Sequence, residues 1–503
     1  MITVYDEFAG FGGSSQGITA VPGTQLVLAA NHHPLAVDVH AANFPHADHY
    51  CGDIAKADIG RFPRADFFSS SPSCPPWTDA RGVKRDFDRS TQGVLFDPAT
   101  GPRALDPTVA RARALMEEVP RYLRAMRLKG TGRPVLAGVV ENVVQVRRWA
   151  EFGRWRREIE AEGYRTKVIA LNSMHVNAPR FGKVAQSRNR FWMGYYLASL
   201  GREPDWDKWL RPTVYCPTCD QTVRAMQVFK QPGVDMGVYG IRHGQYVYRC
   251  PHSSCRNQVV EPIVAGADTI IDWSLHPGQR IGERVDSKGR PDPLAGPTVA
   301  RITAGLRRHA RPLLTPSGGT WRREAAPLDE PLATRTTRES DGLVVPPFVS
   351  LLRGGGSKQA AYPVSGPIPT VSAQGNHHGL VGPPAEALLL AYYSNGPARS
   401  VTDPVGTLTT RDRYGLLGPD HEWAGAGVEI ADVVKRSTFR MLAGHEIGAA
   451  MGFRHDYDVT AVTSKKELVR GFGNAVTPNA MEVLASALIE TITGEALEPA
   501  TNP

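Results

Sequence analysis

The sequence has few cysteines and no long apolar segment. Six of its 503 residues are cysteine, and four of them fall in two close pairs. This favours a reducing compartment with a metal site over a disulfide framework. No run approaches the roughly 18 apolar residues of a membrane span, so we expect no membrane partner. Residues 1–5 (Met-Ile-Thr-Val-Tyr) contain no basic segment, so we also expect no secretory signal.

What the chain does have is length and positive charge. A chain of 503 residues is too long for one compact core, so two or three domains are expected. The hydrophobic content of 41% is that of an ordinary globular protein. The formal net charge of +8 suits a polyanionic partner, although many basic proteins bind no nucleic acid.

The N-terminal residues indicate a cofactor cradle. Residues 2–8 read as a first strand, which runs into a glycine-rich turn at residues 9–17 and then a short helix. Glycines let a backbone approach a ligand, and a helix N-terminus offers free N–H groups. A second strand at residues 25–30 ends at Asn31, where doubly wound sheets commonly bind ribose hydroxyls, and Asp53 follows a plausible third strand.

A stiff loop then carries one cysteine. The apolar residues 65–68 predict a buried strand, and the three prolines around Cys74 exclude a helix there. The loop therefore lies at a strand end, where α/β proteins place their chemistry. Residues 78–106 are polar and aperiodic, which predicts a lid or substrate clamp, or else a disordered insertion. Helical spacing follows at residues 107–129.

Charged side chains follow the next strands. Residues 134–140 predict a strand that ends in Glu141-Asn142-Val143, on the same rim as Cys74. A helix at 148–162 and strands near 166–172 and 190–196 come next. Between those strands, alternation places Gln186, Arg188 and Arg190 on one face.

In this order the motifs resemble those of one family, the S-adenosylmethionine-dependent DNA (cytosine-5) methyltransferases. Residues 6–13 (Asp-Glu-Phe-Ala-Gly-Phe-Gly-Gly) resemble its cofactor motif, and residues 71–75 (Ser-Pro-Ser-Cys-Pro) its catalytic loop. Glu141-Asn142-Val143 and the Gln-x-Arg-x-Arg of residues 186–190 match two more motifs, while residues 440–453 and 473–478 resemble the last two. The resemblance covers residues 1–197 and about 435–490.

The resemblance implies a fold and a set of roles. The expected fold class is α/β: a Rossmann-like class I methyltransferase domain with a mostly parallel sheet, plus a smaller β-rich target-recognition domain carrying a zinc-ribbon-like insert. Cys74 would attack C6 of a flipped-out cytosine, and Glu141 would meet its N3/N4 edge. Arg188 and Arg190 would hold the base carbonyl, the phosphate or the closed loop. S-adenosylmethionine would contact Phe8, Gly10, Gly12, Gly13, Asn31, Asp53, Ile54, Asn474 and Val476.

Two departures from the family pattern stand out. The family usually has Glu where Asn31 stands, which puts its ribose contact in doubt. The usual Pro-Pro-Cys-Gln is here Pro-Ser-Cys-Pro, which keeps the thiol and changes its neighbours. Neither departure removes a catalytic group.

The middle of the chain predicts a metal site. Cys216 and Cys219 form one knuckle, and Cys250 and Cys255 a second after 30 intervening residues. Four thiolates in paired knuckles suit a structural, tetrahedral Zn²⁺, with His252 as a possible replacement ligand. The alternative is four free cysteines. Such a zinc ribbon would stabilise the fold or would bind DNA.

A repeat of about 37 residues follows the ribbon. Thr334, Thr370 and Thr407 each begin a Thr-rich stretch preceded by proline and followed by Gly-Leu, with spacings of 36 and 37 residues. Alternating threonines predict short strands. The candidate phosphate or base contacts are Arg338, Gln374, Arg411 and Arg413. An alternative of equal weight is that the repeats serve as a scaffold and that the loops between them contact DNA.

These observations predict how the chain is divided. Residues 1–199 would form the catalytic domain and residues 200–435 a target-recognition region, with its ribbon at 213–260 and its repeats at 330–418. Residues 436–495 would return to complete the catalytic domain, leaving a tail at 496–503. We expect a helix over 437–451 and a last helix opened by Thr477-Pro478, which packs beside the first strand.

The sequence therefore predicts methyl transfer to cytosine C5 in a specific duplex DNA sequence, for restriction–modification or genome protection. An RNA cytosine methyltransferase of the same fold, a catalytically dead DNA-binding protein and, more weakly, a nicotinamide dehydrogenase are the alternatives. We expect a monomer in the cytoplasm of a bacterial or phage-infected cell, associated with the nucleoid, with a cognate restriction enzyme as a potential partner.

Overall fold

The computed structural model describes residues 1–72, 114–129, 133–265 and 443–500, together with shorter stretches and strands between 267 and 441. A seven-stranded sheet forms its centre, in the order β3-β2-β1-β4-β5-β8-β6. The strands are β1 (Ile2–Glu7), β2 (Thr24–Asn31), β3 (Asp48–Cys51), β4 (Phe67–Ser70), β5 (Ala137–Asn142), β6 (Tyr164–Asn172) and β8 (Asn189–Leu197).

The direction of the strands decides where a site can form. The pairs β1–β2, β2–β3, β1–β4 and β4–β5 are parallel, and β8 alone runs antiparallel to its neighbours β5 and β6. The carboxyl ends of β1–β6 therefore share one rim. This mostly parallel, doubly covered sheet confirms the predicted Rossmann-like methyltransferase fold.

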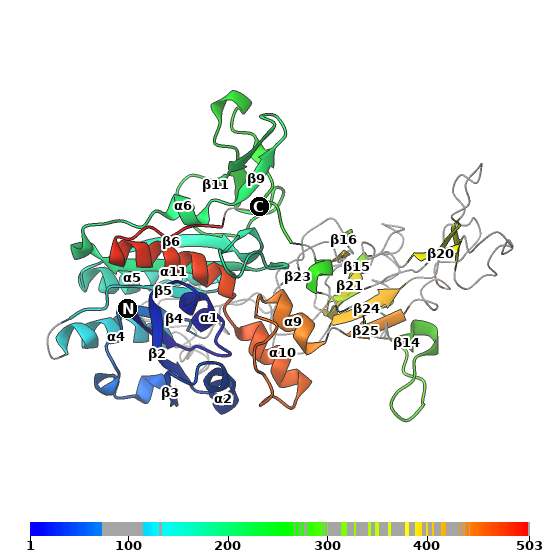
Figure 1. Ribbon diagram of the computed structural model, residues 1–503, viewed down its shortest axis with the longest axis horizontal. Helices are drawn as coiled ribbons and strands as arrows, with labels where there is room; N and C mark the ends of the chain where they lie inside the picture. Colours follow the sequence, from blue (N-terminus) through cyan, green and yellow to red (C-terminus); the bar gives the residue numbers. More distant parts are fainter. Residues whose placement is uncertain are drawn as a thin grey trace, which may run out of the picture.

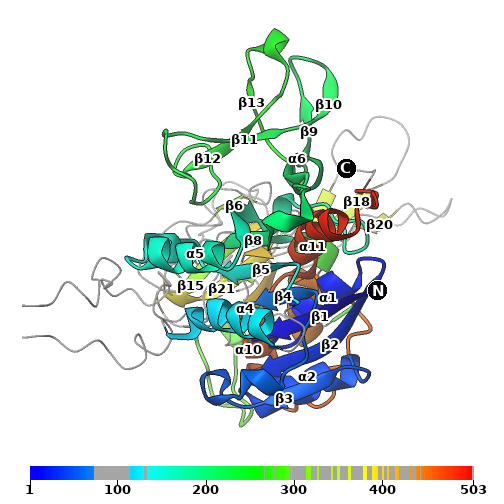
Figure 2. The ribbon, with the colours of Figure 1, turned by 90° about the vertical axis from the view of Figure 1, so that its left-hand side faces the viewer.

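Helices cover both faces of the sheet (Figures 1 and 2). One face packs on α4 (Glu118–Leu128) and α5 (Phe152–Ala161), and the other on α1 (Gly13–Thr19) and α11 (Pro478–Thr493). Helix α2 (Pro34–Asn43) lies beside β2 and β3. Because both faces are covered, strands such as β5 and β8 are buried along their whole length.

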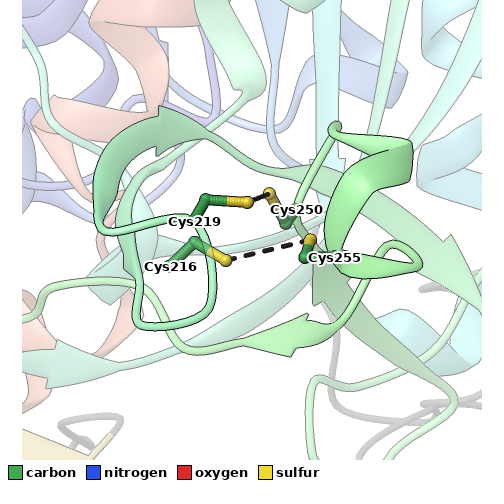
Figure 3. Close-up of side chains that lie close together, drawn as sticks. All are labelled: Cys216, Cys219, Cys250 and Cys255. Atoms are coloured by element: carbon green, nitrogen blue, oxygen red, sulfur yellow. Dashed lines mark hydrogen bonds between the residues drawn. The ribbon is translucent and has the colours of Figure 1, made fainter.

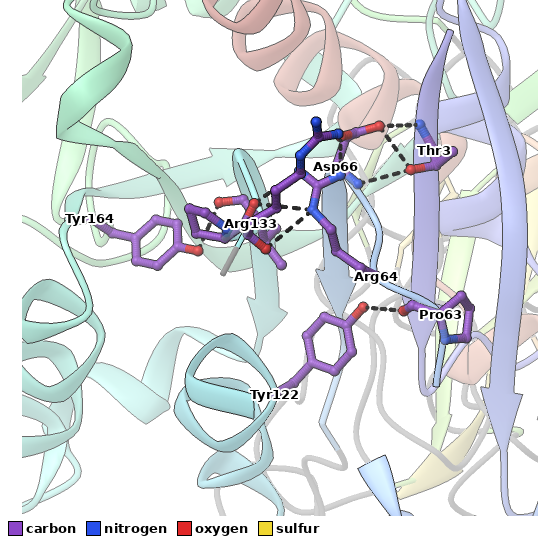
Figure 4. Close-up of polar contacts among 9 residues, drawn as sticks. Thr3, Pro63, Arg64, Asp66, Tyr122, Arg133 and Tyr164 are labelled. Atoms are coloured by element: carbon purple, nitrogen blue, oxygen red, sulfur yellow. Dashed lines mark hydrogen bonds and ion pairs between the residues drawn. The ribbon is translucent and has the colours of Figure 1, made fainter. Parts of the chain in front are cut away.

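Polar contacts fix the opposite rim of the sheet, where the parallel strands begin (Figure 4). Asp66 accepts hydrogen bonds from the backbone N–H and the hydroxyl of Thr3, at 3.0 and 2.8 Å. Arg64 pairs with Asp66 at 2.7 Å and donates to the carbonyl of Pro134 at 2.9 Å. These contacts bind the starts of β1, β4 and β5 together, far from the rim that carries the predicted motifs.

The C-terminal residues return to pack on the central sheet. Helix α11 is buried on nearly all sides, and its first turn packs against α1 so closely that a Cβ on Gly17 would lie 2.4 Å from the carbonyl oxygen of Pro478. Pro478 stands at the first helical position, where its missing N–H costs no hydrogen bond. Helices α9 (Gly444–Ala450) and α10 (Lys465–Asn474) precede α11.

The predicted helix over 437–451 is wrong in its first third. Thr438–Met441 form a strand, β25, which pairs antiparallel with β24 (Tyr414–Gly418). Helix α9 begins only at Gly444. Pairing with a neighbouring strand outweighs the local helical pattern, because propensity is a weak preference that tertiary context overrides.

Residues 213–260 form a module that stands on the edge of the sheet next to β6 (Figure 1). Its backbone forms two small antiparallel sheets. Val214, Tyr246 and Tyr248 belong to the same buried cluster as the α4–α5 face, so the module shares a core with the catalytic sheet. Its strands are β9 (Thr213–Cys216), β10 (Gln221–Arg224), β11 (Met226–Phe229), β12 (Tyr246–Arg249) and β13 (Val259–Val260), preceded by helix α6 (Trp206–Leu210).

The Gly-Leu dipeptides of the three sequence repeats occupy equivalent places in the backbone. They lie in β17 (Asp341–Leu343), β20 (His378–Val381) and β24, each antiparallel to the first strand of its own repeat. Those first strands are β15 (Leu313–Gly318), β18 (Phe348–Leu351) and β21 (Leu388–Ser394). The first and third repeats also pair with each other in parallel, Gly342 opposite Gly415. The sequence repeat is therefore a structural repeat.

The remaining strands are short: β7 (Gln186–Ser187), β14 (Gln279–Arg280), β16 (Ala326–Pro327), β19 (Ala361–Pro363), β22 (Arg399–Ser400) and β23 (Val405–Gly406). β23 pairs in parallel with β7, so the third repeat contacts the Gln-x-Arg-x-Arg motif. Arg338, Gln374, Arg411 and Arg413 lie outside the described residues. Of the helices that the structure describes, none combines the length and apolar composition needed to cross a membrane.

Candidate active site at the carboxyl rim of the sheet

The segment that leads to Cys74 starts where β1, β4 and β5 end. The backbone N–H of Ser71 donates to the carbonyl of Glu7 at 3.1 Å, which continues the β1–β4 pairing for one residue. The side-chain amide of Asn142 donates to the carbonyl of Pro72 at 3.1 Å. Cys74 itself lies outside the described residues, but its loop leaves the sheet beside the Glu-Asn-Val motif.

Glu141 and Arg190 form a buried ion pair on this rim. The Nε atom of Arg190 lies 2.9 Å from Oε1 of Glu141, and the two residues are only 8% and 5% exposed. They come from adjacent antiparallel strands, β5 and β8. A carboxylate and a guanidinium held together in this way offer hydrogen-bond acceptors and fixed N–H donors to one small planar ligand.

Arg188 contacts the C-terminal return instead of this pair. Its guanidinium donates to the carbonyl of Ala475 at 2.8 Å and to that of Gly473 at 3.3 Å. It therefore holds the turn between α10 and α11 against β8. Gln186 is fully buried, and its amide has no hydrogen-bond partner among the residues that the structure describes. Whether Arg188 also contacts substrate stays a prediction.

The glycine-rich loop has the backbone of a ligand cradle. Phe8, Gly10 and Gly12 all have positive φ angles, of 60°, 55° and 84°. A Cβ on Gly13 would lie 2.0 Å from the carbonyl oxygen of Val476, so only glycine allows the C-terminal return to approach this closely. The N-cap residue of α1 is Gly12, so no N-cap side chain competes with a ligand for the N–H groups of the first turn, of which that of Ser15 bonds Asp6.

The other predicted cofactor residues lie at neighbouring strand ends. Asn31 ends β2, and its side-chain oxygen accepts from the N–H of His33 at 2.9 Å. Asp53 follows β3 and accepts from the N–H of Ala55 at 3.3 Å, and Ile54 beside it is buried. Asn474 ends α10 with its side chain exposed. These residues and the cradle fit an elongated nucleoside cofactor such as S-adenosylmethionine.

Two buried carboxyl groups, which the motif analysis did not single out, lie beneath the cradle. Asp6 faces α1 and accepts from the hydroxyls of Ser14 and Ser15, at 2.5 and 2.6 Å. Glu7 faces the other way and accepts from Tyr5 at 3.1 Å and Ser70 at 2.9 Å. Burial raises the pKa of Asp6 to about 6 and that of Glu7 to about 8. Alternation along β1 is the only sequence signal for their opposite directions.

The four paired cysteines meet in one cluster (Figure 3). The sulfur atoms of Cys216, Cys219, Cys250 and Cys255 all lie within 4.8 Å of one another. The 216–255 and 219–250 sulfur pairs are each 3.9 Å apart. Tetrahedral zinc with Zn–S bonds of about 2.3 Å requires sulfurs about 3.8 Å apart, so the cluster fits a Zn²⁺ ion. His252 contributes its backbone carbonyl to Cys255, not a ring nitrogen to the cluster.

A hairpin of the cysteine module reaches the rim near Arg190; we call residues 239–246 the rim hairpin. The N–H of Tyr239 donates to Oδ1 of Asn189 at 3.0 Å. The ammonium of Lys230 donates to the carbonyls of Gly240 and Ile241, at 2.8 and 2.7 Å. The tip is thereby fixed with Ile241 49% exposed, and Arg242 beside it is exposed as well.

The fold and the rim together define a Rossmann-like methyltransferase. Residues 2–125 match the family model of C-5 cytosine-specific DNA methylases, which confirms the predicted resemblance. The family assignment supports methyl transfer to cytosine, with S-adenosylmethionine as the implied cofactor. No curated protein matches the chain in sequence.

Solved structures of methyltransferases are similar to the chain over most of its length. Entamoeba histolytica EhMeth shares 10% identity, with 97% of this chain and 98% of that chain covered and a TM-score of 0.44. S. pombe Dnmt2 shares 11% identity, with 98% and 100% covered and a TM-score of 0.48. An E. coli prophage protein described as a DNA modification methyltransferase shares 12% identity, with 98% and 100% covered and a TM-score of 0.43.

Proposed function

We propose that the protein transfers a methyl group from S-adenosylmethionine to C5 of a flipped-out cytosine in a specific double-stranded DNA sequence. The observation that carries this proposal is the meeting of three motifs on one rim. The hydrogen bond from Asn142 to Pro72 brings the start of the Cys74 loop beside Glu141, which is paired with Arg190.

The chemistry needs a nucleophile because C5 of cytosine cannot simply be deprotonated. The Cys74 thiolate attacks C6, and the electrons of the 5,6 double bond move to C5, which then takes the methyl group. The bound cofactor supplies this group as an electrophilic sulfonium methyl. Loss of the C5 proton and elimination of the thiolate restore the ring and free Cys74. C6 is hidden in stacked DNA, so the base must leave the helix.

Glu141 and Arg190 would bind the flipped base. Glu141 can hydrogen-bond the N3/N4 edge, and a proton shared with N3 draws electron density from C6 and assists attack. Arg190 has N–H groups beyond the ion pair for the base carbonyl. Arg188 would act through the turn that it holds, by keeping the C-terminal return against the cradle.

DNA is the proposed substrate, and RNA is the second candidate substrate for the same methyl transfer. The net charge of +8 and the large middle region with its structural repeat favour a long, sequence-specific duplex interface. The cysteine module would hold a structural Zn²⁺ through its four thiolates. We further propose a cytoplasmic, nucleoid-associated monomer that serves genome protection, with or without a cognate restriction enzyme.

Bisulfite sequencing of plasmid from cells that express the chain tests the proposal. Cytosines protected in one sequence context, and converted when Cys74→Ser is expressed instead, would establish both activity and specificity. If both plasmids convert fully, DNA is not the substrate. The same comparison on total RNA then decides the second candidate, and binding of purified protein to DNA without modification would indicate a non-catalytic role.

A further inference from the structure

A continuous chain of hydrogen bonds runs behind the glycine-rich cradle. Ser15 donates to Oδ2 of Asp6 at 2.6 Å, and its oxygen lies 2.8 Å from Nε2 of His40. Nδ1 of His40 lies 2.8 Å from Nε2 of His49. The four side chains come from four of the first five elements of the fold: β1, α1, α2 and β3. The chain therefore links the outer strand of the sheet to the strand that carries the cofactor motif.

The direction of every bond in this chain follows from the first one. Because Ser15 uses its only proton on Asp6, its oxygen must accept from Nε2–H of His40. The Nδ1 atom of that neutral ring then accepts from Nε2–H of His49. Burial lowers the pKa of His40 to about 3, which keeps its ring neutral at physiological pH. One neutral tautomer of His40 satisfies both bonds of its ring.

His40 also forms part of the wall of the cradle. A Cβ added to Gly12 would lie 2.9 Å from Cδ2 of His40 and 2.5 Å from the hydroxyl of Tyr457. Tyr457 in turn donates to the carbonyl of Phe11. The ring of His40 is 1% exposed, so it lies wholly between α2 and the loop. It thus contacts the loop at Gly12 and bonds the first turn of α1 at Ser15.

We propose that His40 is a positioning residue for cofactor binding, which holds the loop of residues 8–13 in its left-handed conformation through Ser15 and Asp6. His49 orients His40 by donating to its second nitrogen. This inference rests on the proposed function, since S-adenosylmethionine is the ligand of that loop. The positive φ angle of Phe8, which is not a glycine, costs backbone energy, so the loop needs such support to be ready before the ligand arrives.

Calorimetric titration of the full-length protein with S-adenosylhomocysteine tests the proposal without any turnover. His40→Phe fills the same space but removes both hydrogen bonds, and we expect its Kd to rise about tenfold, the effect of losing neutral hydrogen bonds inside the protein. His40→Gln supplies an amide N–H for Ser15 and an oxygen for His49, and we expect a Kd within about threefold of wild type. His46→Gln, at an exposed histidine outside the chain of bonds, is the matched control.

Two results would overturn the inference: an unchanged Kd in folded His40→Phe, or a His40→Gln protein as weak as His40→Phe. If His40→Phe does not fold, Ser15→Ala breaks the same chain at its centre and carries the same expectation. The KM for S-adenosylmethionine should rise with the Kd, whereas the KM for DNA should not. A wild-type chain that binds no S-adenosylhomocysteine would instead contradict the proposed function together with this inference.

Discussion

The side-chain amide of Asn142 donates a hydrogen bond to the carbonyl oxygen of Pro72, 3.1 Å away. This bond joins the end of β5 to the start of the segment that carries Cys74, across 70 positions of sequence. The same amide also contacts the sulfur of Met116 in front of α4, at 3.7 Å. Asn142 therefore fixes where the segment that leads to Cys74 leaves the sheet.

Removing this bond should slow methyl transfer without weakening cofactor binding. We expect Asn142→Ala to lower the single-turnover rate about a hundredfold, because small errors in the position of a nucleophile have large effects. Asn142→Asp keeps the bond to the N–H of Val143 but cannot donate to Pro72. We therefore expect its single-turnover rate to fall as far as that of Asn142→Ala. An Asp variant as fast as wild type, measured with radiolabelled cofactor, would contradict this account.

Breaking the ion pair of Glu141 should also cost stability. Glu141→Ala leaves the buried guanidinium of Arg190 without its carboxylate, and we expect the free energy of unfolding to fall by about 3–5 kcal/mol. Glu141→Gln retains a carbonyl acceptor for Arg190, so its free energy of unfolding should fall by less than that of Glu141→Ala. Urea unfolding measures both. If the alanine variant is as stable as wild type, another group must stabilise the buried charge of Arg190.

Glu7 should make stability fall as the pH rises from about 4.5 to about 8. Burial raises its pKa from 4.5 to about 8, with Glu118 adding to the rise and Arg121 and the bonds from Ser70 and Tyr5 opposing it. Between these values the native state holds a proton that the unfolded chain has released. Stability therefore falls as pH rises through that window, by at most about 1.4 kcal/mol per pH unit.

Glu7→Gln should flatten this dependence, because glutamine stays neutral and can still accept from Ser70. Groups present in both proteins, among them Asp6 with its pKa raised to about 6 and His40 with its pKa lowered to about 3, cancel in the difference between the two curves, so that difference from pH 6 to 8 reports Glu7. The measurement is urea unfolding of both proteins at half-unit steps. Two curves that run parallel from pH 6 to 8 would show that Glu7 is already ionised in the native state.

The cysteine module should carry one Zn²⁺ per chain. Cys250→Ser should release the metal, detected by elemental analysis, and lower the unfolding temperature by more than about 5 °C. Cys51→Ser is the matched control because Cys51 is exposed at the end of β3, outside the cluster. Wild-type protein that is purified without chelator and contains no zinc would contradict the prediction.

The rim hairpin should contact the nucleic acid beside the flipped base. We expect Arg242→Ala to weaken DNA binding about tenfold and to reduce the slope of log K against log salt by about one. Arg256→Ala removes an exposed arginine next to the Cys250–Cys255 knuckle and should change neither quantity. If the two variants weaken DNA binding equally, the effect comes from the loss of positive charge in general and not from a contact of the rim hairpin.

The sequence predicts the central sheet well because its strands are apolar runs bounded by turn residues. The strands that end at Glu7, Asn31 and Asn142 all end within about two residues of the expected positions. Strand β25 was missed because Thr438–Met441 are strand only through their pairing with β24. That pairing joins residues which no local pattern relates.

The sequence identifies the motif residues of the site, but it does not predict which of their side chains contact one another. The Glu141–Arg190 pair depends on β8 lying antiparallel beside β5, and the carbonyl contacts of Arg188 depend on the C-terminal return. His40 carries no motif, and its role emerges only when α2 packs behind the loop. The placement of Cys74 and the catalytic and cofactor roles of the named residues stay predictions.

The late position of α11 has a consequence for biosynthesis. Ribosomes add about 5–20 residues per second, and domains generally fold as their sequence emerges. Here β8 ends at Leu197, whereas the helix that packs against Gly17 begins at Pro478. The nascent sheet must therefore wait, with one apolar face uncovered, while the whole middle region is translated. We expect newly made chains to depend on chaperones, and prematurely terminated chains to aggregate before they can bind cofactor.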